Sequence, residues 1–251
     1  MSSEATPERV VLPKPEKVPL SKLMEAVLPY QSGIYVTVLN IIQCITLAFL
    51  IVEVREAVSK DELGLKCMGR ALLALAIILV IWHRYTAEMQ YLWQITWTDT
   101  VGPFSMGLIE CVIVFLINDT KVSLIWFVGS ILFLQIFAIE TYVDAYLRRK
   151  DKVTERLYKE FYKDFPIFAE YLILFLRLYD WWSIKFMMRF GFIPVSVFFL
   201  LVWLFPALEF FDITFSLTCV LSMLIGENLR GFHRFLREDP VLGPCFTRGD
   251  E

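Results

Sequence analysis

The sequence lacks the short motifs by which many enzymes are identified. It contains no HExxH, GxSxG, P-loop or GxGxxG pattern. Its five cysteines are scattered without the spacing of a zinc site, and their odd number argues against a disulfide framework. Only two histidines are present, at unrelated positions, which argues against haem ligation by a histidine pair. We therefore expect no cofactor and no metal, and the sequence favours a non-catalytic protein over an enzyme.

A concentration of basic residues is also absent. Lys and Arg number 24 against 27 Asp and Glu, a net charge of −3, whereas a nucleic-acid surface gathers basic side chains on one face. We therefore do not expect nucleic acid as a partner. The first 33 residues hold five prolines and lack the basic flank and apolar core of a signal peptide, so we expect the first membrane helix to direct insertion.

Long apolar runs dominate what is present. Hydrophobic residues make up 57% of the chain and charged residues 20%, against about 45–50% and about 25% in an ordinary soluble domain. A helix needs about 20 mostly apolar residues to cross the hydrocarbon layer. Three runs approach or exceed this length without a charge, and three more do so if some charge is accepted: 26–52, 122–139 and 190–208, then 69–91, 101–117 and 212–229. The sequence predicts an all-α, polytopic membrane bundle of about six transmembrane helices.

Residues 148–226 predict one turn and one helix that does not cross the membrane. The run 190–226 must fold back, because 37 residues of helix are too long for one crossing, and Pro206 with the acids Glu209 and Asp212 marks the expected turn. Residues 148–190 alternate apolar and charged positions at a helical period. This predicts a basic segment followed by an amphipathic helix in the plane of the interface. A seventh span over 166–182 is the alternative.

The distribution of basic residues predicts the orientation. With the N-terminus inside, 19 of the 24 Lys and Arg residues lie in cytoplasmic segments and 5 in outer loops, so both termini are expected in the cytoplasm. The chain then divides into five regions: a proline-rich N-terminal segment (1–33), a four-helix transmembrane region (34–147), the basic segment with the interfacial helix (148–190), a transmembrane hairpin (191–229) and a cytoplasmic tail (230–251).

Glu110 is the residue most informative about function, because it falls near the middle of the span 101–117. A carboxylate at that depth must face protein or water. Gly107, one turn away, would let a neighbouring helix approach closely. Two interpretations stay open: an ion or proton path that Gln135 and Ser130 of the next span also line, or a packing contact between helices.

Charged and aromatic residues gather near the inner ends of the spans. We expect an ionic cluster in which Arg84 pairs with Glu140 or Glu88, and snorkelling of these side chains to the interface is the alternative. The members of the cluster are His83, Arg84, Glu88, Asp99, Glu140 and Asp144. The interfacial helix carries a candidate surface for lipid or a partner, formed by Arg177, Lys185, Arg189, Trp181 and Trp182.

Two functions follow from these features. One is an oligomeric membrane protein that passes an ion or proton past Glu110, in the manner of a channel or transporter. The other is a non-catalytic subunit or anchor of a larger membrane complex, which binds partners or lipid through its N-terminus and its interfacial helix. In both cases the expected partners are membrane lipid and other membrane proteins, in a homo- or hetero-oligomer. A membrane enzyme acting on lipid is a third, less supported hypothesis.

Overall fold

The described part of the chain is helical throughout. The structure is a computed structural model that describes residues 20–61, 64–88, 97–118 and 124–229, and within these ranges it contains no β-strand. The prediction of an all-α protein is therefore confirmed. The α-helices are α1 (Leu20–Ser59), α2 (Leu65–Glu88), α3 (Trp97–Phe115), α4 (Leu124–Arg149), α5 (Lys152–Phe161), α6 (Pro166–Phe186), α7 (Ile193–Leu204) and α8 (Asp212–Leu229).

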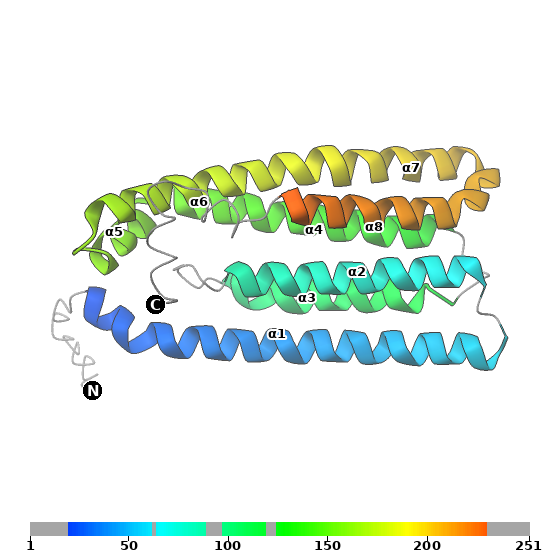
Figure 1. Ribbon diagram of the computed structural model, residues 1–251, viewed down its shortest axis with the longest axis horizontal. Coiled ribbons are helices and arrows are strands. Elements are labelled where there is room, and N and C mark those ends of the chain that lie inside the picture. The colour runs from blue at the N-terminus through cyan, green and yellow to red at the C-terminus, as the bar shows by residue number, and fades with distance from the viewer. Residues whose placement is uncertain (1–19, 62–63, 89–96, 119–123, 230–251) are drawn as a thin grey trace, which may run out of the picture.

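The helices form a long bundle in which α1, α2, α3, α4, the continuous segment of α6 and α7, and α8 alternate in direction (Figure 1). The connections from α1 to α2, from α3 to α4 and from α7 to α8 lie at one end of the bundle, which we call the hairpin end. The opposite end carries α5 and the start of α1, and we call it the α5 end. Packing is closest between α2 and α8, between α1 and α3, and between α4 and the segment formed by α6 and α7.

Four of the described helical segments are long and apolar enough to cross a membrane. They are Thr37–Ser59, Leu65–Tyr85, Leu124–Arg148 and Leu172–Leu204. Two shorter apolar helices, Val101–Phe115 and Asp212–Leu224, run beside them. Large apolar side chains also cover the outside of the bundle, as on a protein surrounded by lipid. These features support the prediction of an integral membrane protein.

Residues 166–204 form one continuous rod (Figure 1). α6 passes directly into a π-helical turn, Met187–Phe192, and then into α7; the Ile193 N–H donates to the carbonyl of Met188, five residues back. This wide turn comes just before Pro194, which has no N–H and whose ring would clash with the carbonyl four residues earlier in an α-helix. The predicted in-plane helix is not confirmed, and the rod contains no reversal that a seventh span would need.

The amphipathic pattern of α6 is explained by burial against protein. α6 packs on α4 and α5, and a small second core at the α5 end joins α5 to α6 through Tyr158, Leu172, Ile173, Phe175 and Leu176. The separate helix α5 starts at Asp151, whose side chain accepts a hydrogen bond from the Val153 N–H. The main core lies among the six long or apolar helices.

Candidate functional site

Glu110 lies in the interface between α3 and α1. It is 1% exposed, and Gln43 of α1 donates through Nε2 to both of its carboxylate oxygens, at 3.3 and 3.2 Å. Thr46, three residues further along α1, is also buried and donates to the Ile42 carbonyl at 3.0 Å. Glu110 therefore has a hydrogen-bonding partner on the neighbouring helix, which is the arrangement that the packing interpretation describes.

Gly107 permits the close approach of α1 and α3 that this contact needs. A Cβ atom at position 107 would lie 2.3 Å from Cγ2 of Ile42, far inside van der Waals contact. Ile42 is β-branched, so its χ1 angle has little freedom to move that methyl group away. The position of Glu110 opposite Gln43 thus depends on a residue without a side chain one turn away.

The other two residues of the predicted path lie apart from Glu110. Ser130 donates to the carbonyls of Trp126 and Phe127 in its own helix, at 2.7 and 3.2 Å. Gln135 lines a cavity, and the described lining of that cavity does not include Glu110 or Ser130. Among the described residues, the structure does not bring the three side chains together along one path.

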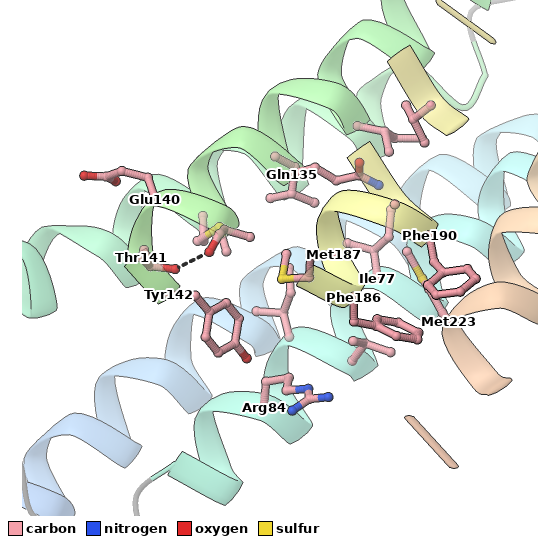
Figure 2. Close-up of a pocket in the computed structure, with 18 of the residues that line it drawn as sticks. Ile77, Arg84, Gln135, Glu140, Thr141, Tyr142, Phe186, Met187, Phe190 and Met223 are labelled. Atoms are coloured by element: carbon pink, nitrogen blue, oxygen red, sulfur yellow. Dashed lines mark hydrogen bonds between the residues drawn. The ribbon is translucent and has the colours of Figure 1, made fainter. Parts of the chain in front are cut away.

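The cavity beside Gln135 lies between α2, α3, α4, α8 and the rod formed by α6 and α7 (Figure 2). Its volume is about 560 Å³, within the range of about 300–1,000 Å³ that ligand pockets occupy. On α4 the lining runs from Ile131 to Arg148, or about 26 Å at about 1.5 Å per residue. The cavity is therefore long, and most of its wall is apolar, with Ile77, Met106, Leu134, Val195, Phe198, Phe215 and Met223 among the lining residues.

The lining changes from apolar to charged towards the α5 end. The charged residues there come from α2, α4 and the start of α5: Arg84, Glu140, Asp144, Arg148 and Asp151. Gln135 stands closer to the apolar part, and its Oε1 is buried and makes no hydrogen bond to a described residue. The cavity is therefore amphipathic along the axis of the bundle, as an amphipathic ligand would require.

The π-helical turn forms part of the cavity wall. Met187 and Phe190 of this turn line the cavity, together with Phe186 at the end of α6 (Figure 2). Gly191 of the turn also lines it, and a Cβ on Gly191 would lie 3.3 Å from the Gln135 side chain. π-Helical turns inside longer helices occur frequently at functional sites. This wall was not predicted from the sequence. The available signal was the pair Gly191 and Pro194 inside an otherwise unbroken apolar run.

The predicted ionic cluster is only partly assembled. Arg84 donates through Nη1 to the hydroxyl of Tyr179 in α6, and its guanidinium carbon lies 5.9 Å from the centre of that ring. Asp144 pairs with Arg148 at 2.8 Å within α4. Glu140 is exposed and has no ion-pair partner among the described residues. The described contacts therefore include Tyr179 of α6 beside Arg84 and no ion pair between Arg84 and Glu140. The alternative pairing with Glu88 involves a side chain outside the described residues.

The predicted lipid or partner surface on α6 makes contacts with α4 and α5. Trp181 stacks on Tyr146 of α4 with ring centres 5.7 Å apart, and Nζ of Lys185 lies 4.8 Å from the centre of the Trp181 ring. Arg177 lies 3.8 Å from Glu155 of α5. Trp181 and Lys185 are exposed and Arg177 is half-buried, so this surface is used only in part for packing within the molecule.

The remaining predicted site residues fall into two groups. His83 on α2 and Arg189 in the π-helical turn are exposed. The side chains of Glu88, Asp99 and Trp182 lie outside the described residues.

A buried ion pair at the hairpin end was not anticipated. Arg70 of α2 contacts Oδ2 of Asp212 in α8 through Nε at 2.8 Å and Nη2 at 2.6 Å. The same guanidinium donates through Nη1 to the carbonyl of Leu116 after α3, at 2.9 Å, and lies 4.9 Å from the centre of the Phe127 ring of α4. One arginine thus joins α2, α8, the end of α3 and α4.

The described residues contain no group of three metal-ligating side chains. No family model, no curated protein and no solved structure matches this chain. The cavity and the helices around it therefore carry the functional argument.

Proposed function

We propose that this chain is a non-catalytic membrane protein that holds a membrane lipid in the cavity between α2, α4, α7 and α8, as a component of a larger membrane assembly. The observation that carries the proposal is the change of the cavity lining from apolar to charged along the bundle axis. A phospholipid has the same order of parts, with hydrocarbon chains at one end and a charged headgroup at the other.

The proposal includes six membrane crossings with both termini on the cytoplasmic side. Four long apolar helical segments and two shorter ones supply six antiparallel segments. The α5 end, which carries most of the basic residues of 148–189, then faces the cytoplasm. In this orientation α6 extends the α7 span out of the bilayer, and the charged end of the cavity lies at the level of the inner headgroups.

The length of the cavity supports a lipid as the occupant. A bilayer is about 40–45 Å thick with its headgroups, so one leaflet measures roughly half of that. The lining of α4 covers about 26 Å at about 1.5 Å per residue. A single phospholipid standing along the bundle axis would therefore reach from the charged residues to the apolar part of the cavity.

A photoactivatable phospholipid with a diazirine in its acyl chain tests the proposal. Purified protein is illuminated with the analogue, and the labelled peptides are mapped by mass spectrometry with and without excess unlabelled lipid. We expect saturable labelling of peptides from α4, α7 and α8. Ala138 lines the cavity, so the larger side chain of Ala138→Trp should occupy the cavity and abolish that labelling.

Ala48→Trp is the matched control, because Ala48 is exposed on α1 away from the cavity. This variant should keep the saturable labelling. Labelling that excess lipid does not reduce, or that both tryptophan variants leave unchanged, would contradict the proposal.

A second proposed function is passage of an ion or proton by an oligomer of this chain. The observation in its favour is the fully buried Glu110 inside an apolar helix, since carboxylates at membrane depth often belong to ion pathways. Flux measured in liposomes across a range of pH tests it. Flux that falls at least tenfold in Glu110→Gln would support this function, whereas no flux from folded wild-type protein would exclude it.

A further inference from the structure

The apolar part of the cavity is open on one side, between α7 and α8. On the other helices around it, Ile77 of α2, Met106 of α3 and Leu134 of α4 line the cavity and are buried. Along the rod and α8, several lining residues are instead exposed, namely Phe190, Pro194, Thr214 and Thr218. We call the opening between these four residues the α7/α8 slit.

The packing of the two helices explains the slit. α7 packs on α4 and α8 packs on α2, and the two helices make few direct contacts with each other. They are joined by the turn Pro206–Phe211 and by the stacked rings of Phe198 and Phe215, whose centres lie 4.4 Å apart. Neither helix therefore closes the cavity on the side that faces the bilayer.

The exposed residues of α8 differ in kind between the slit and the outer face. Among the described side chains of α8, the exposed ones that line the cavity are Thr214 and Thr218. The exposed ones that do not line it are Leu217, Leu221 and Leu224. Ser222, which is half-buried, continues the first set, because residues four apart share a helix face. We call Thr214, Thr218 and Ser222 the hydroxyl row.

The hydroxyl row is not used in bonds within the protein. Thr46 and Ser130 donate to backbone carbonyls of their own helices, at 3.0 and 2.7 Å, which is the usual arrangement for a hydroxyl inside a helix. The hydroxyl row makes no hydrogen bond to a described residue, and neither does the side chain of Gln135 on α4. Polar groups at membrane depth are costly without a partner, so this part of the cavity requires a polar occupant.

The cavity is long enough to connect the two leaflets. Phe211 lines it beside Asp212 at the start of α8. Arg70 contacts both Asp212 and the Phe127 ring, so this end of the cavity lies near the level of Phe127 on α4. From Phe127 to Arg148, which lines the other end, α4 rises about 32 Å at about 1.5 Å per residue. The hydrocarbon core of a bilayer is about 30 Å thick.

We propose that phospholipids cross between the leaflets through the α7/α8 slit. The headgroup moves inside the cavity along the hydroxyl row, and the acyl chains remain in the bilayer outside the slit. Movement occurs in both directions and needs no energy source, because it only equalises the two leaflets. This inference rests on the proposed lipid-binding function and adds transit to it.

The lateral opening favours a lipid over an ion as the passenger. A path for ions is lined by protein that separates it from hydrocarbon. Here the exposed apolar side chains of Phe190 and Pro194 stand at the same opening as the hydroxyl row. An amphipathic molecule can place its polar part on one and its apolar part on the other.

A lipid-exchange assay in liposomes tests the inference. Vesicles of phosphatidylcholine carry a trace of the same lipid with a nitrobenzoxadiazole group on one acyl chain, and external dithionite reduces only the probe in the outer leaflet. We expect folded wild-type protein to make the inner-leaflet probe reducible as well. A fluorophore trapped inside the vesicles must stay unreduced, which shows that dithionite itself does not enter.

A first set of variants removes the hydroxyl row. The combined changes Thr214→Val, Thr218→Val and Ser222→Ala keep the size of the side chains nearly constant. They should slow the exchange about tenfold, because each lost hydroxyl removes a hydrogen-bonding partner of the headgroup. The matched control is Ser130→Ala with Ser196→Ala, which removes hydroxyls of α4 and α7 that do not line the cavity.

A second pair of variants blocks the slit. Thr218→Trp places a large side chain in the opening and should slow the exchange at least as much. Leu217→Trp is its control, since Leu217 is the exposed neighbour that does not line the cavity, and it should exchange lipid like the wild type. This pair decides the inference if the triple variant does not fold.

The outcomes separate this inference from the function on which it rests. Saturable photolabelling of the cavity without exchange by folded wild-type protein would overturn the transit inference and uphold lipid binding. Equal exchange by the Thr218→Trp and Leu217→Trp variants would overturn the slit as the route, and ion flux without lipid exchange would assign the cavity to another passenger. Absence of saturable labelling in the wild type would overturn both proposals.

Discussion

At the scale of single residues, Gly107 sets the distance between two membrane helices. We expect Gly107→Ala to lower the free energy of unfolding by about 1–3 kcal/mol, the usual cost of overpacking, because the new methyl group would lie 2.3 Å from Ile42 Cγ2. Gly102→Ala on the same helix is the control, since nothing lies within 4 Å of a Cβ there. Chemical unfolding in detergent compares the two variants. The added change Ile42→Leu, which removes the Cγ2 methyl group, should restore part of the loss, and equal stability of the two alanine variants would refute the argument.

The ion pair at the hairpin end gives a second prediction. Asp212→Ala leaves the Arg70 guanidinium buried without its carboxylate, and breaking such a pair typically costs about 3–5 kcal/mol. Replacing both partners with apolar residues, as in Arg70→Met with Asp212→Leu, should cost less than the single change. Glu56→Ala is the control, because the Lys60–Glu56 pair is 56% and 47% exposed and should contribute less than about 1 kcal/mol. Thermal unfolding of the purified variants measures these differences, and similar losses for Asp212→Ala and Glu56→Ala would contradict the structural role of the buried pair.

These two sites differ in how far the sequence could predict them. Gly107 was identified because a helical turn separates it from a charged residue inside a span, and short-range spacing is visible in a sequence. Arg70 lies at the outer end of the predicted span 69–91, where the sequence alone gives it no partner. In the structure α2 begins earlier, at Leu65, and places Arg70 on the same face as the buried Leu73 and Ile77. Its partner Asp212 lies 142 positions away, and no local pattern gives a pairing at that separation.

At the scale of elements, α6 shows the limit of a helical period. The period predicted correctly that this segment is a helix, but it does not say what covers the apolar face that the pattern implied. In the structure α4 and α5 cover it, so the helix needs no membrane surface to bury its apolar residues. The same limit applies to the π-helical turn, which arises where the rod meets Pro194.

The pair formed by Glu155 and Lys159 within α5 predicts a pH effect at the same scale. A hydrogen bond and the charge of Lys159 lower the pKa of the Glu155 carboxyl below its usual value of 4.5. Because the pKa is lowered in the folded state, the contribution is present above that usual value and is lost as the pH falls through the folded-state pKa. We expect backbone hydrogen exchange in 152–161, corrected for intrinsic rates, to increase on acidification below about pH 4.5.

The Glu155→Gln variant tests the cause of this effect. It should reduce the acid-dependent increase in exchange, since the amide does not titrate over this range. Glu160→Gln on the same helix should keep the increase. An identical acid response in wild type and Glu155→Gln would assign the effect to other groups.

At the scale of the whole molecule, the class of the protein was predictable and the cavity was not. Each apolar run can be recognised alone, because the hydrophobic thickness of a bilayer fixes its length. The cavity instead depends on how α2, α4, α8 and the rod of α6 and α7 meet, and its lining residues are scattered from Ile77 to Met223. Gln135 was singled out as a polar residue within a span, yet its place in a cavity rather than beside Glu110 follows only from the helix packing.

The six-span arrangement makes a prediction about the two ends of the bundle. The native cysteines are first replaced, and the change Cys67→Ser retains a donor to Asn118. A single cysteine is then introduced at Ser59 near the hairpin end, or at Lys163 near the α5 end. A membrane-impermeant maleimide added to intact cells should label Ser59→Cys, and should label Lys163→Cys only after permeabilisation. The reason is that α1 ends at Ser59 on the outer side, while Lys163 precedes the rod that crosses back to that side. Labelling of both positions from one side would contradict a membrane-crossing bundle axis, and the reverse pattern would place the charged end of the cavity in the outer leaflet.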